Sequence, residues 1–382
     1  MESLPRDLIT VLRQSFIVPD GPITTLKGSG RKLEHLPESF GSLSSLVTLD
    51  LTNNRLTALP PSFGSLSSLV TLDLTNNCLT ALPPSFGSLS SLVTLNLHYN
   101  HLTTLPESFG SLSSLVTLTL NNNRLTALPE SFGSLSSLVT LTLNNNYLTA
   151  LPESFGSLSS APLPCSLRSL VTLNLHYNRL TTLPESFGSL SSLITLTLND
   201  NRLTTLPESF GSLSSLVTLY LNNNYLTALP ESFGSPSSAP LPRSLRSLIT
   251  LNLTANRLTT LPESIGSLSS LVNLYLSNNQ LTALPASFGS LSSLNTLNLA
   301  NNFLTALPPS FGSLSSLVTL YISNNQLITP ASLATLYSNN PPLPSLRSIH
   351  IDLDNLIIPD FRSFLALWYL GYMKGSLVIW NP

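Results

Sequence analysis

The chain has 382 residues, of which 42% are hydrophobic and only 9% are charged, and its formal net charge is -2. This balance excludes the basic stripe with which nucleic-acid-binding proteins neutralise phosphates. Two cysteines cannot form the disulfide framework of a small secreted domain. The longest apolar stretch near the C-terminus, "FLALWYLGYM", is far shorter than the roughly 20 residues that a membrane span needs. We therefore expect no nucleic-acid partner and no membrane span.

The N-terminal segment, residues 1–22, is expected to form a helical cap. Its stretch "SLPRDLITVLRQSF" (3–16) has a proline near the start and an amphipathic pattern. Charged residues such as Arg6 and Arg13 interrupt any apolar run of the kind found in a signal peptide. We therefore expect a protein of the reducing cytoplasm.

Residues 23–356 repeat one pattern. The segment "LVTLTLNNNRLTALPESFGSLSS" at 115–137 returns with few changes. In "TLTLN", Leu118 and Leu120 stand two residues apart, so they point to one side of a short strand and the intervening threonines to the other. The coils start at Ile23, Leu46, Leu69, Leu92, Leu115, Leu138, Leu170, Leu193, Leu216, Leu248, Leu271, Leu294, Leu317 and Leu346. This period predicts a solenoid whose coils pair their strands in parallel.

The pattern L-x-x-L-x-L-x-x-N-x-L-x-x-L-P-x-S-F-G-S-L-S-S resembles the leucine-rich repeat. The "LPxSFGxL" half is similar to the intracellular Ras-suppressor and plant Ras-group-related type with 23-residue repeats. The resemblance implies a curved α/β-type horseshoe dominated by β structure, with an inner parallel sheet of about 14 strands and helical caps at both ends. It also implies a non-catalytic protein-interaction scaffold in intracellular signalling, with a small GTPase or its regulator among the expected partners.

The second half of each coil is too short and too rich in proline, glycine and serine for an α-helix, so we expect 3₁₀ turns or single helical turns there. One aromatic ring per coil fills the wide, convex end of the core, with Ile265 as the one aliphatic substitute. These rings are Phe40, Phe63, Phe86, Phe109, Phe132, Phe155, Phe187, Phe210, Phe233, Phe288 and Phe311. A stripe of glutamates that follows each "LP", such as Glu263, is expected to serve solubility.

One asparagine per coil stands where the strand turns. The turn leaves backbone N–H and C=O groups buried, and an asparagine amide can both donate to and accept from them. We therefore expect a structural ladder, rather than a ligand site, at Asn54, Asn77, Asn100, Asn123, Asn146, Asn178, Asn201, Asn224, Asn256, Asn279, Asn302 and Asn325.

Short insertions interrupt the period. "APLPCSLRS" (161–169) and "APLPRSLRS" (239–247) are alike, and "PPLPSLRS" (341–348) is a partial echo. Residues 92–169 and 170–247 are near copies, which indicates growth of the array by duplication of a three-coil block. The insertions are either docking bumps, because "PLP" favours an extended backbone, or tolerated remnants of duplication.

Residues 357–382 are expected to cap the C-terminal end, because the open end of a solenoid exposes its core. "DFRSFLALWYLGY" (360–372) predicts a helix, and "SLVIW" after it a strand. Trp368 and Trp380 lie in this cap, where covering the core is the expected role and docking a partner the alternative.

No catalytic or cofactor motif is found, and we expect neither an enzyme nor a cofactor. The sequence lacks a glycine-rich phosphate loop, Cys-x-x-Cys and His-Glu-x-x-His. His98 and His101 share one coil, so a weak metal site is the alternative to a polar surface. We expect no metal centre.

Tyrosine, arginine and histidine side chains on the concave face and on a lateral row form the candidate partner-binding surface. The lateral row is the position after each ladder asparagine. Tyrosine and arginine dominate interface hot spots, although a solvated edge is an equally simple interpretation. The candidates are His98, Tyr99, His101, Arg124, Tyr147, His176, Tyr177, Arg179, Arg202, Tyr220, Tyr225, Tyr275 and Tyr321.

Two alternatives to the scaffold remain open at this stage. The regular rows of threonine and asparagine favour binding of a repetitive non-protein surface such as a glycan or ice. The near-identity of the coils is also compatible with an effector that mimics the repeat proteins of a host.

Overall fold

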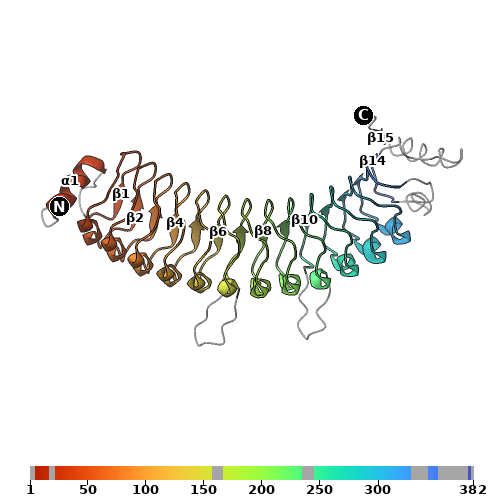
Figure 1. Cartoon of the computed structure of the whole chain (residues 1–382), viewed down its shortest axis with the longest axis horizontal. Coiled ribbons are helices and arrows are strands. Elements are labelled where there is room, and N and C mark those ends of the chain that lie inside the picture. Colours follow the sequence, from red (N-terminus) through yellow and green to blue (C-terminus); the bar gives the residue numbers. More distant parts are fainter. Residues whose placement is uncertain are drawn as a thin grey trace. The chain divides into compact units, whose positions relative to one another are not determined.

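A computed structural model describes residues 5–16, 22–156, 167–234, 245–327, 343–351 and 377–379. The chain divides into two compact units, Met1–Leu193 and Ile194–Pro382, called here the first and the second unit. Each unit is a stack of coils with strands along one side and 3₁₀ helices along the opposite side (Figure 1). The predicted leucine-rich repeat solenoid is thereby confirmed. The predicted helix 360–372, both tryptophans and the "PLP" parts of the insertions 161–169 and 239–247 lie outside the described residues.

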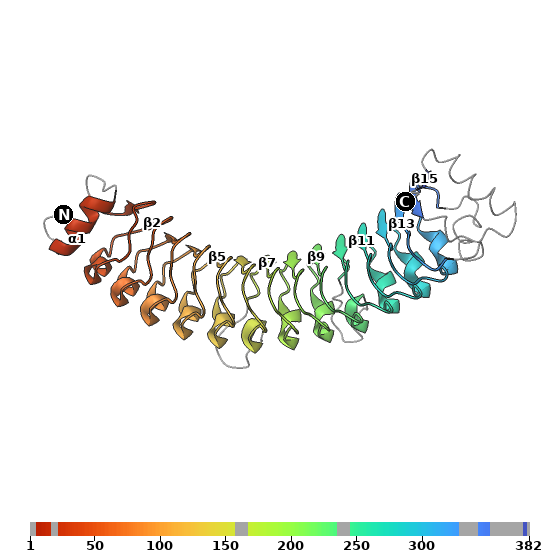
Figure 2. The same ribbon diagram turned by 45° about the horizontal axis from the view of Figure 1, so that its top comes forward.

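The first unit begins with helix α1 (Arg6–Ser15), which lies beside the first coils (Figure 2). The helix buries Leu8 and Leu12, and just after it Phe16 packs against Phe40 with ring centroids 6.0 Å apart. The strands pair in parallel and in chain order: β1 (Thr25–Lys27), β2 (Thr48–Asp50), β3 (Thr71–Asp73), β4 (Thr94–Asn96), β5 (Thr117–Thr119), β6 (Thr140–Thr142) and β7 (Thr172–Asn174). The 3₁₀ helices are η1 (Glu38–Ser42), η2 (Pro61–Ser65), η3 (Pro84–Ser88), η4 (Glu107–Ser111), η5 (Glu130–Ser134), η6 (Glu153–Phe155) and η7 (Glu185–Ser189).

The second unit continues the same arrangement. Its strands are β8 (Thr195–Thr197), β9 (Thr218–Tyr220), β10 (Thr250–Asn252), β11 (Asn273–Tyr275), β12 (Thr296–Asn298), β13 (Thr319–Tyr321), β14 (Ser348–Ile351) and β15 (Leu377–Ile379), all parallel and in chain order. Its 3₁₀ helices are η8 (Glu208–Ser212), η9 (Glu231–Phe233), η10 (Glu263–Ser267), η11 (Ala286–Ser290) and η12 (Pro309–Ser313). The strand expected in "SLVIW" is β15, which pairs with β14.

The core is built from leucines that stack from coil to coil. In β5, Leu118 is fully buried, whereas the flanking Thr117 and Thr119 are half-buried on the opposite face. The parallel register places each such leucine beside the next, as in the Leu118 to Leu141 pair. Leu120, just after the strand, is buried as well. The alternation of inward leucine and outward polar residue is the period of two that the sequence predicts.

The phenylalanine rings form a second stack behind the leucines. From Phe40 to Phe155, neighbouring rings are nearly parallel, with centroids 6.1–6.2 Å apart. Paired strands lie only about 4.8 Å apart. Because the coils are wider spaced at the rings than at the strands, the strand side of the first unit is concave. The 6.0–6.1 Å spacing of the Phe210 and Phe233 rings and of the Phe288 and Phe311 rings makes the strand side of the second unit concave too.

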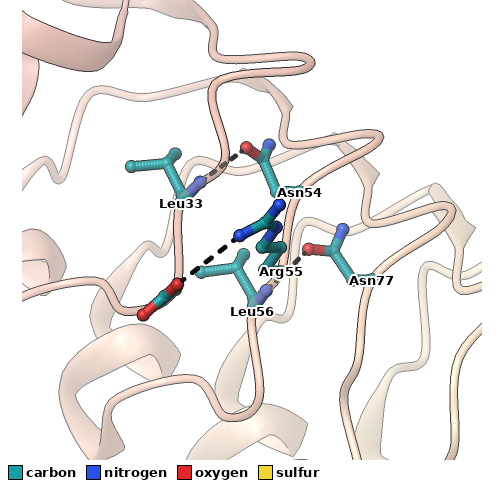
Figure 3. Close-up of polar contacts among 6 residues, drawn as sticks. Leu33, Asn54, Arg55, Leu56 and Asn77 are labelled. Carbon is teal, nitrogen blue, oxygen red and sulfur yellow. Dashed lines mark hydrogen bonds and ion pairs between the residues drawn. The ribbon is translucent and has the colours of Figure 1, made fainter.

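Each ladder asparagine ties its own coil to the one before. Asn123 donates from Nδ2 to the carbonyls of Leu97 (2.9 Å) and Leu120 (3.1 Å), and its Oδ1 accepts the N–H of Leu102 (3.0 Å). Figure 3 shows the acceptor half of this arrangement in the first coils, where the N–H groups of Leu33 and Leu56 donate to Asn54 and Asn77. These bonds supply partners to backbone groups that the three-residue strands leave unpaired.

A second inter-coil contact, not anticipated from the sequence, runs along the 3₁₀ side. The Ser131 hydroxyl donates to the carbonyl of Glu107 in the preceding coil, at a distance of 2.5 Å. The glycine of "SFGS" packs so closely that a Cβ on Gly133 would collide with the carbonyl of Ser154. Only glycine permits this approach, which explains why this glycine recurs where a turn alone would tolerate other residues.

Candidate functional site

The turn after each strand has a left-handed backbone at the residue that precedes the ladder asparagine. Asn and Asp occupy this position in most coils, with φ from 52° to 57°. These residues tolerate a left-handed backbone because their short polar side chains bond locally. Tyr99 (φ 51°) and Tyr177 (φ 52°) occupy the same position in the first unit. A bulky residue in this conformation is strained by about 1 kcal/mol or more.

Burial does not compensate this strain. Tyr99 and Tyr177 are 54% and 55% exposed, the largest exposures among the exposed large hydrophobic residues. Both belong to the sequence "LHYN", which the block duplication placed twice in the chain. A strained, exposed aromatic residue points to a role in binding.

Both tyrosines line one open groove of about 660 Å³ in the first unit, which also includes Asn76, Asn77 and Cys78 of the coil before Tyr99. Their coils lie three strand spacings apart, which corresponds to about 14 Å along the sheet. Between them the groove is lined by the asparagines of the intervening turns and by His101, Arg124 and Tyr147 of the lateral row. The lining is rich in hydrogen-bond donors, and it contains one cation, Arg124, and no carboxylate.

Neighbouring side chains support the aromatic walls. The His98 ring lies 4.0 Å from that of Tyr99, centroid to centroid, and the His176 ring lies 5.2 Å from that of Tyr177. At the side of the groove, the guanidinium of Arg179 stacks over the ring of Tyr147 at 4.4 Å. Such contacts hold aromatic rings in one orientation.

The structure brings five of the thirteen predicted candidates into this groove: Tyr99, His101, Arg124, Tyr147 and Tyr177. His98, His176 and Arg179 support it. The remaining five belong to the second unit: Arg202, Tyr220, Tyr225, Tyr275 and Tyr321. The thirteen candidates are therefore divided between the two units.

Five of the groove residues were candidates from the sequence, but the feature that singles out two of them was not. The positive φ angle at this position cannot be inferred from the sequence of any single coil. The available signal was comparative, because asparagine or aspartate stands at this position in nearly every coil and tyrosine in only two.

The residues that the structure describes include no cluster of metal-binding side chains. No group of three or more His, Cys, Asp or Glu side chains there could hold a metal ion. His98 and His101 instead contact backbone carbonyls, at 3.2 Å from Asn121 O and 3.0 Å from Asn100 O. No helix among the described residues is long and apolar enough to cross a membrane.

Comparison with protein families gives one consistent result. A profile described as leucine rich repeat matches residues 29–79, 44–102, 67–125, 113–160, 166–234 and 282–327. A second leucine-rich repeat profile matches residues 247–268 and 270–291. Comparison of the sequence with curated proteins gives no match. The profiles describe leucine-rich repeats in general, so the Ras-suppressor-like subtype stays a prediction.

Solved structures of leucine-rich proteins resemble the chain over most of its length. A leucine-rich repeat protein of Leptospira interrogans is 34% identical, with a TM-score of 0.65 over 83% of this chain and 81% of that chain. PEPR1-AtPEP1 is 31% identical, with a TM-score of 0.67 over 85% of this chain and 46% of that chain. YopM, a leucine-rich effector protein from Yersinia pestis, is 29% identical, with a TM-score of 0.51 over 79% and 78%. This fold is typical of protein-binding scaffolds and receptors, which are generally not enzymes.

Proposed function

The chain belongs to the leucine-rich repeat family, and from this premise we propose that it is a non-catalytic scaffold whose first-unit groove binds a partner protein. The observation that carries the proposal is the pair of exposed tyrosines, Tyr99 and Tyr177, in a left-handed backbone that disfavours them. A residue that strains the fold without adding to the core is best explained by what it contacts outside the chain.

The composition of the groove fits a protein partner. Tyrosine and arginine are the residue types that contribute most to protein interfaces, because they combine a large apolar area with hydrogen-bonding groups. The groove offers three tyrosines and Arg124, together with the amides of Asn76, Asn122 and Asn145, because the ladder amides in its lining already bond to backbone groups. A partner loop with free carbonyl groups or a carboxylate would satisfy both the amides and the guanidinium.

The cellular setting is part of the same proposal. We place the protein in a reducing, intracellular compartment, in keeping with a chain of 382 residues that has only two cysteines, of which Cys78 is a free, half-buried thiol. A role in signalling, with a small GTPase or its regulator as partner, rests on the resemblance of the repeats alone.

The test replaces both tyrosines with the residue that neighbouring coils use. Tyr99→Asn with Tyr177→Asn suits the left-handed backbone, so the variant keeps its fold while the groove loses its walls. A photo-cross-linking amino acid at position 147 then reports on the groove in lysate of the native cell. Phe303→Gln is the matched control, because this exposed residue of the second unit has glutamine at the same position in both adjacent coils.

We expect a defined cross-linked partner with the original chain and with Phe303→Gln, and its loss with the double variant. Purified partner should then bind with at least a tenfold weaker Kd to the double variant. A partner that cross-links equally to both forms would move the interface away from the two tyrosines. No cross-linked protein with any form would contradict the proposal.

A further inference from the structure

A regular row of side chains crosses the strand face of the second unit. The last residues of successive strands alternate between tyrosine and asparagine: Tyr220, Asn252, Tyr275, Asn298 and Tyr321, called here the Tyr–Asn row. The parallel register places each directly beside the next. Tyr220 is 36% exposed, and Tyr275 and Tyr321 are half-buried. The row ends at β14, where the His350 ring stacks on Tyr321 at 4.3 Å.

The spacing of the rings follows from the sheet. Neighbouring strands lie about 4.8 Å apart, so a tyrosine on every second strand gives a repeat of about 9.6 Å. On a concave face the ends of the side chains converge slightly, which brings this repeat toward 9 Å. A ligand that repeats at this distance would meet one ring per period.

The asparagines between the rings are oriented by their own backbone. Oδ1 of Asn252 accepts the N–H of Thr254 at 3.0 Å, and Oδ1 of Asn298 accepts that of Ala300 at 3.1 Å. One lone pair of each oxygen is engaged in this way, and the NH₂ group of each amide is available as a donor for a ligand. The row therefore presents aromatic rings alternating with hydrogen-bond donors.

The surroundings of the row carry no charge. On one side stand the first residues of the strands, Thr218, Thr250, Asn273, Thr296 and Thr319. On the other side stand Asn222, Thr254, Ser277, Ala300 and Ser323. A neutral face of this kind selects against nucleic acids and strongly charged peptides, whose binding depends on ion pairs.

We propose that the Tyr–Asn row binds a neutral proline-rich segment of a partner in the polyproline II conformation, which runs across the strands. This helix has three residues per turn and a rise of about 3.1 Å per residue, so it repeats every 9.3 Å or so. Each turn then places a proline ring on one tyrosine. Polyproline II has no internal hydrogen bonds, so its carbonyls are free to accept from the asparagine NH₂ groups.

Other peptide conformations do not match the period. An extended strand repeats its side chains about every 6.7 Å on one face, and an α-helix rises about 5.4 Å per turn. Either would lose its match with the rings after one tyrosine. Aromatic surfaces that recognise proline-rich segments use the same combination of flat rings and donors.

The proposal goes beyond the scaffold function, because it concerns another surface and another unit. The test measures fluorescence anisotropy of a labelled neutral peptide with four Pro-Pro-Ala repeats, titrated with the full chain. A peptide of the same length with glycine in place of every proline is the ligand control. The test variant is Tyr275→Asn, which introduces the residue of both adjacent strands, and Phe303→Gln is the control variant, because glutamine occupies that lateral position in both adjacent coils.

We expect saturable binding of the proline peptide, at least tenfold weaker binding of the glycine peptide, and at least a tenfold rise in Kd for Tyr275→Asn. Phe303→Gln should bind the peptide like the original chain, and added salt should leave Kd within about twofold because the face is neutral. Absence of binding, or equal binding by Tyr275→Asn, would overturn the proposal. So would a neutral β-linked glucose oligosaccharide that binds the row while the peptide does not.

The two proposals fail separately. Loss of the cross-linked partner in the Tyr99 and Tyr177 variant tests the groove, whereas the peptide titration tests the Tyr–Asn row. If the chain captures a partner through the groove but does not bind the proline peptide, the scaffold proposal stands and the proposal for the Tyr–Asn row is wrong.

Discussion

The two units share one scaffold and differ in where their tyrosines stand. In the first unit Tyr99 and Tyr177 occupy the strained turn position, and the strands end in lysine, aspartate, asparagine or threonine. In the second unit the strand ends carry Tyr220, Tyr275 and Tyr321, and aspartate, asparagine or alanine occupies the turn.

This difference shows how a highly repetitive chain can hold distinct surfaces. The leucines, the phenylalanines, the glycine of "SFGS" and the ladder asparagine are fixed by contacts between coils. The residue at the strand end and the two residues that flank the ladder asparagine face outward. Tyrosine is found at these outward positions, where it produces a groove wall in one place and a sheet-face row in another.

The largest effect is expected where the units are the same. Leu118→Asp in the first unit and Leu274→Asp in the second should each lower the free energy of unfolding by about 4 kcal/mol, because a buried carboxylate would have no partner. Both leucines are fully buried. Urea unfolding followed by circular dichroism measures the loss. Thr119→Asp, on the outward face beside Leu118, is the control, and a loss as large there would contradict the assignment of faces.

The ladder should rank next. Asn123→Ala removes three hydrogen bonds from the buried carbonyls of Leu97 and Leu120 and the N–H of Leu102. At about 1 kcal/mol for each group left unpaired, the variant should lose about 3 kcal/mol in the same unfolding experiment. The neighbouring Asn122→Gly suits a left-handed backbone and should change stability by less than about 0.5 kcal/mol. Equal losses at the two positions would argue against a structural ladder.

These two predictions use features that the sequence alone indicates. The leucine period predicts the strands and the inward faces, because one residue in two must avoid water. The recurrent asparagine predicts a polar contact between coils, because an amide is the side chain that both donates and accepts.

Other features depend on geometry between coils and could not be predicted. The close approach of Gly133 to the Ser154 carbonyl needs the stacking distance of two coils, and the strain at Tyr99 needs a torsion angle. The candidate set from the sequence mixes groove residues with residues elsewhere, because the sequence does not show which side chains of different coils lie together. Sequence assigns Tyr147 and Tyr225 to one row, but only the structure shows which of them lines the groove.

The turn position offers the sharpest contrast between structure and function. Tyr99→Asn should raise the free energy of unfolding by about 1 kcal/mol, because asparagine tolerates the left-handed backbone. Ala255→Asn should have a similar effect in the second unit, where alanine has φ of 55° and no proposed partner. Thermal unfolding measures both. If Tyr99→Asn destabilises while Ala255→Asn stabilises, the contact of Tyr99 with His98 outweighs the strain, and the argument for binding from strain fails.

The smallest expected effect concerns a glutamate of the second unit that we predicted to serve solubility only. The carboxylate of Glu263 accepts the N–H groups of Ala286 (3.0 Å) and Ser287 (2.9 Å) in the next coil. The backbone hydrogen bond from Ser287, then the Ser287 side chain and the backbone of Ala286, lower the pKa of Glu263 below its ordinary value of 4.5. The stabilisation by the Glu263 carboxylate is therefore complete above the ordinary pKa of 4.5 and is lost as the pH falls through the lowered pKa.

Glu263→Gln should accordingly reduce the melting temperature slightly at pH 7 and leave it unchanged near pH 2, where the original carboxyl is protonated. Glu130→Gln is the matched control in the first unit, because the Glu130 backbone carbonyl makes the corresponding bond to Ser154 whatever its side chain. A melting temperature that falls equally for both variants at pH 7 would indicate a general effect of surface charge. A fall confined to Glu263→Gln would show that one exposed glutamate joins two coils in the second unit.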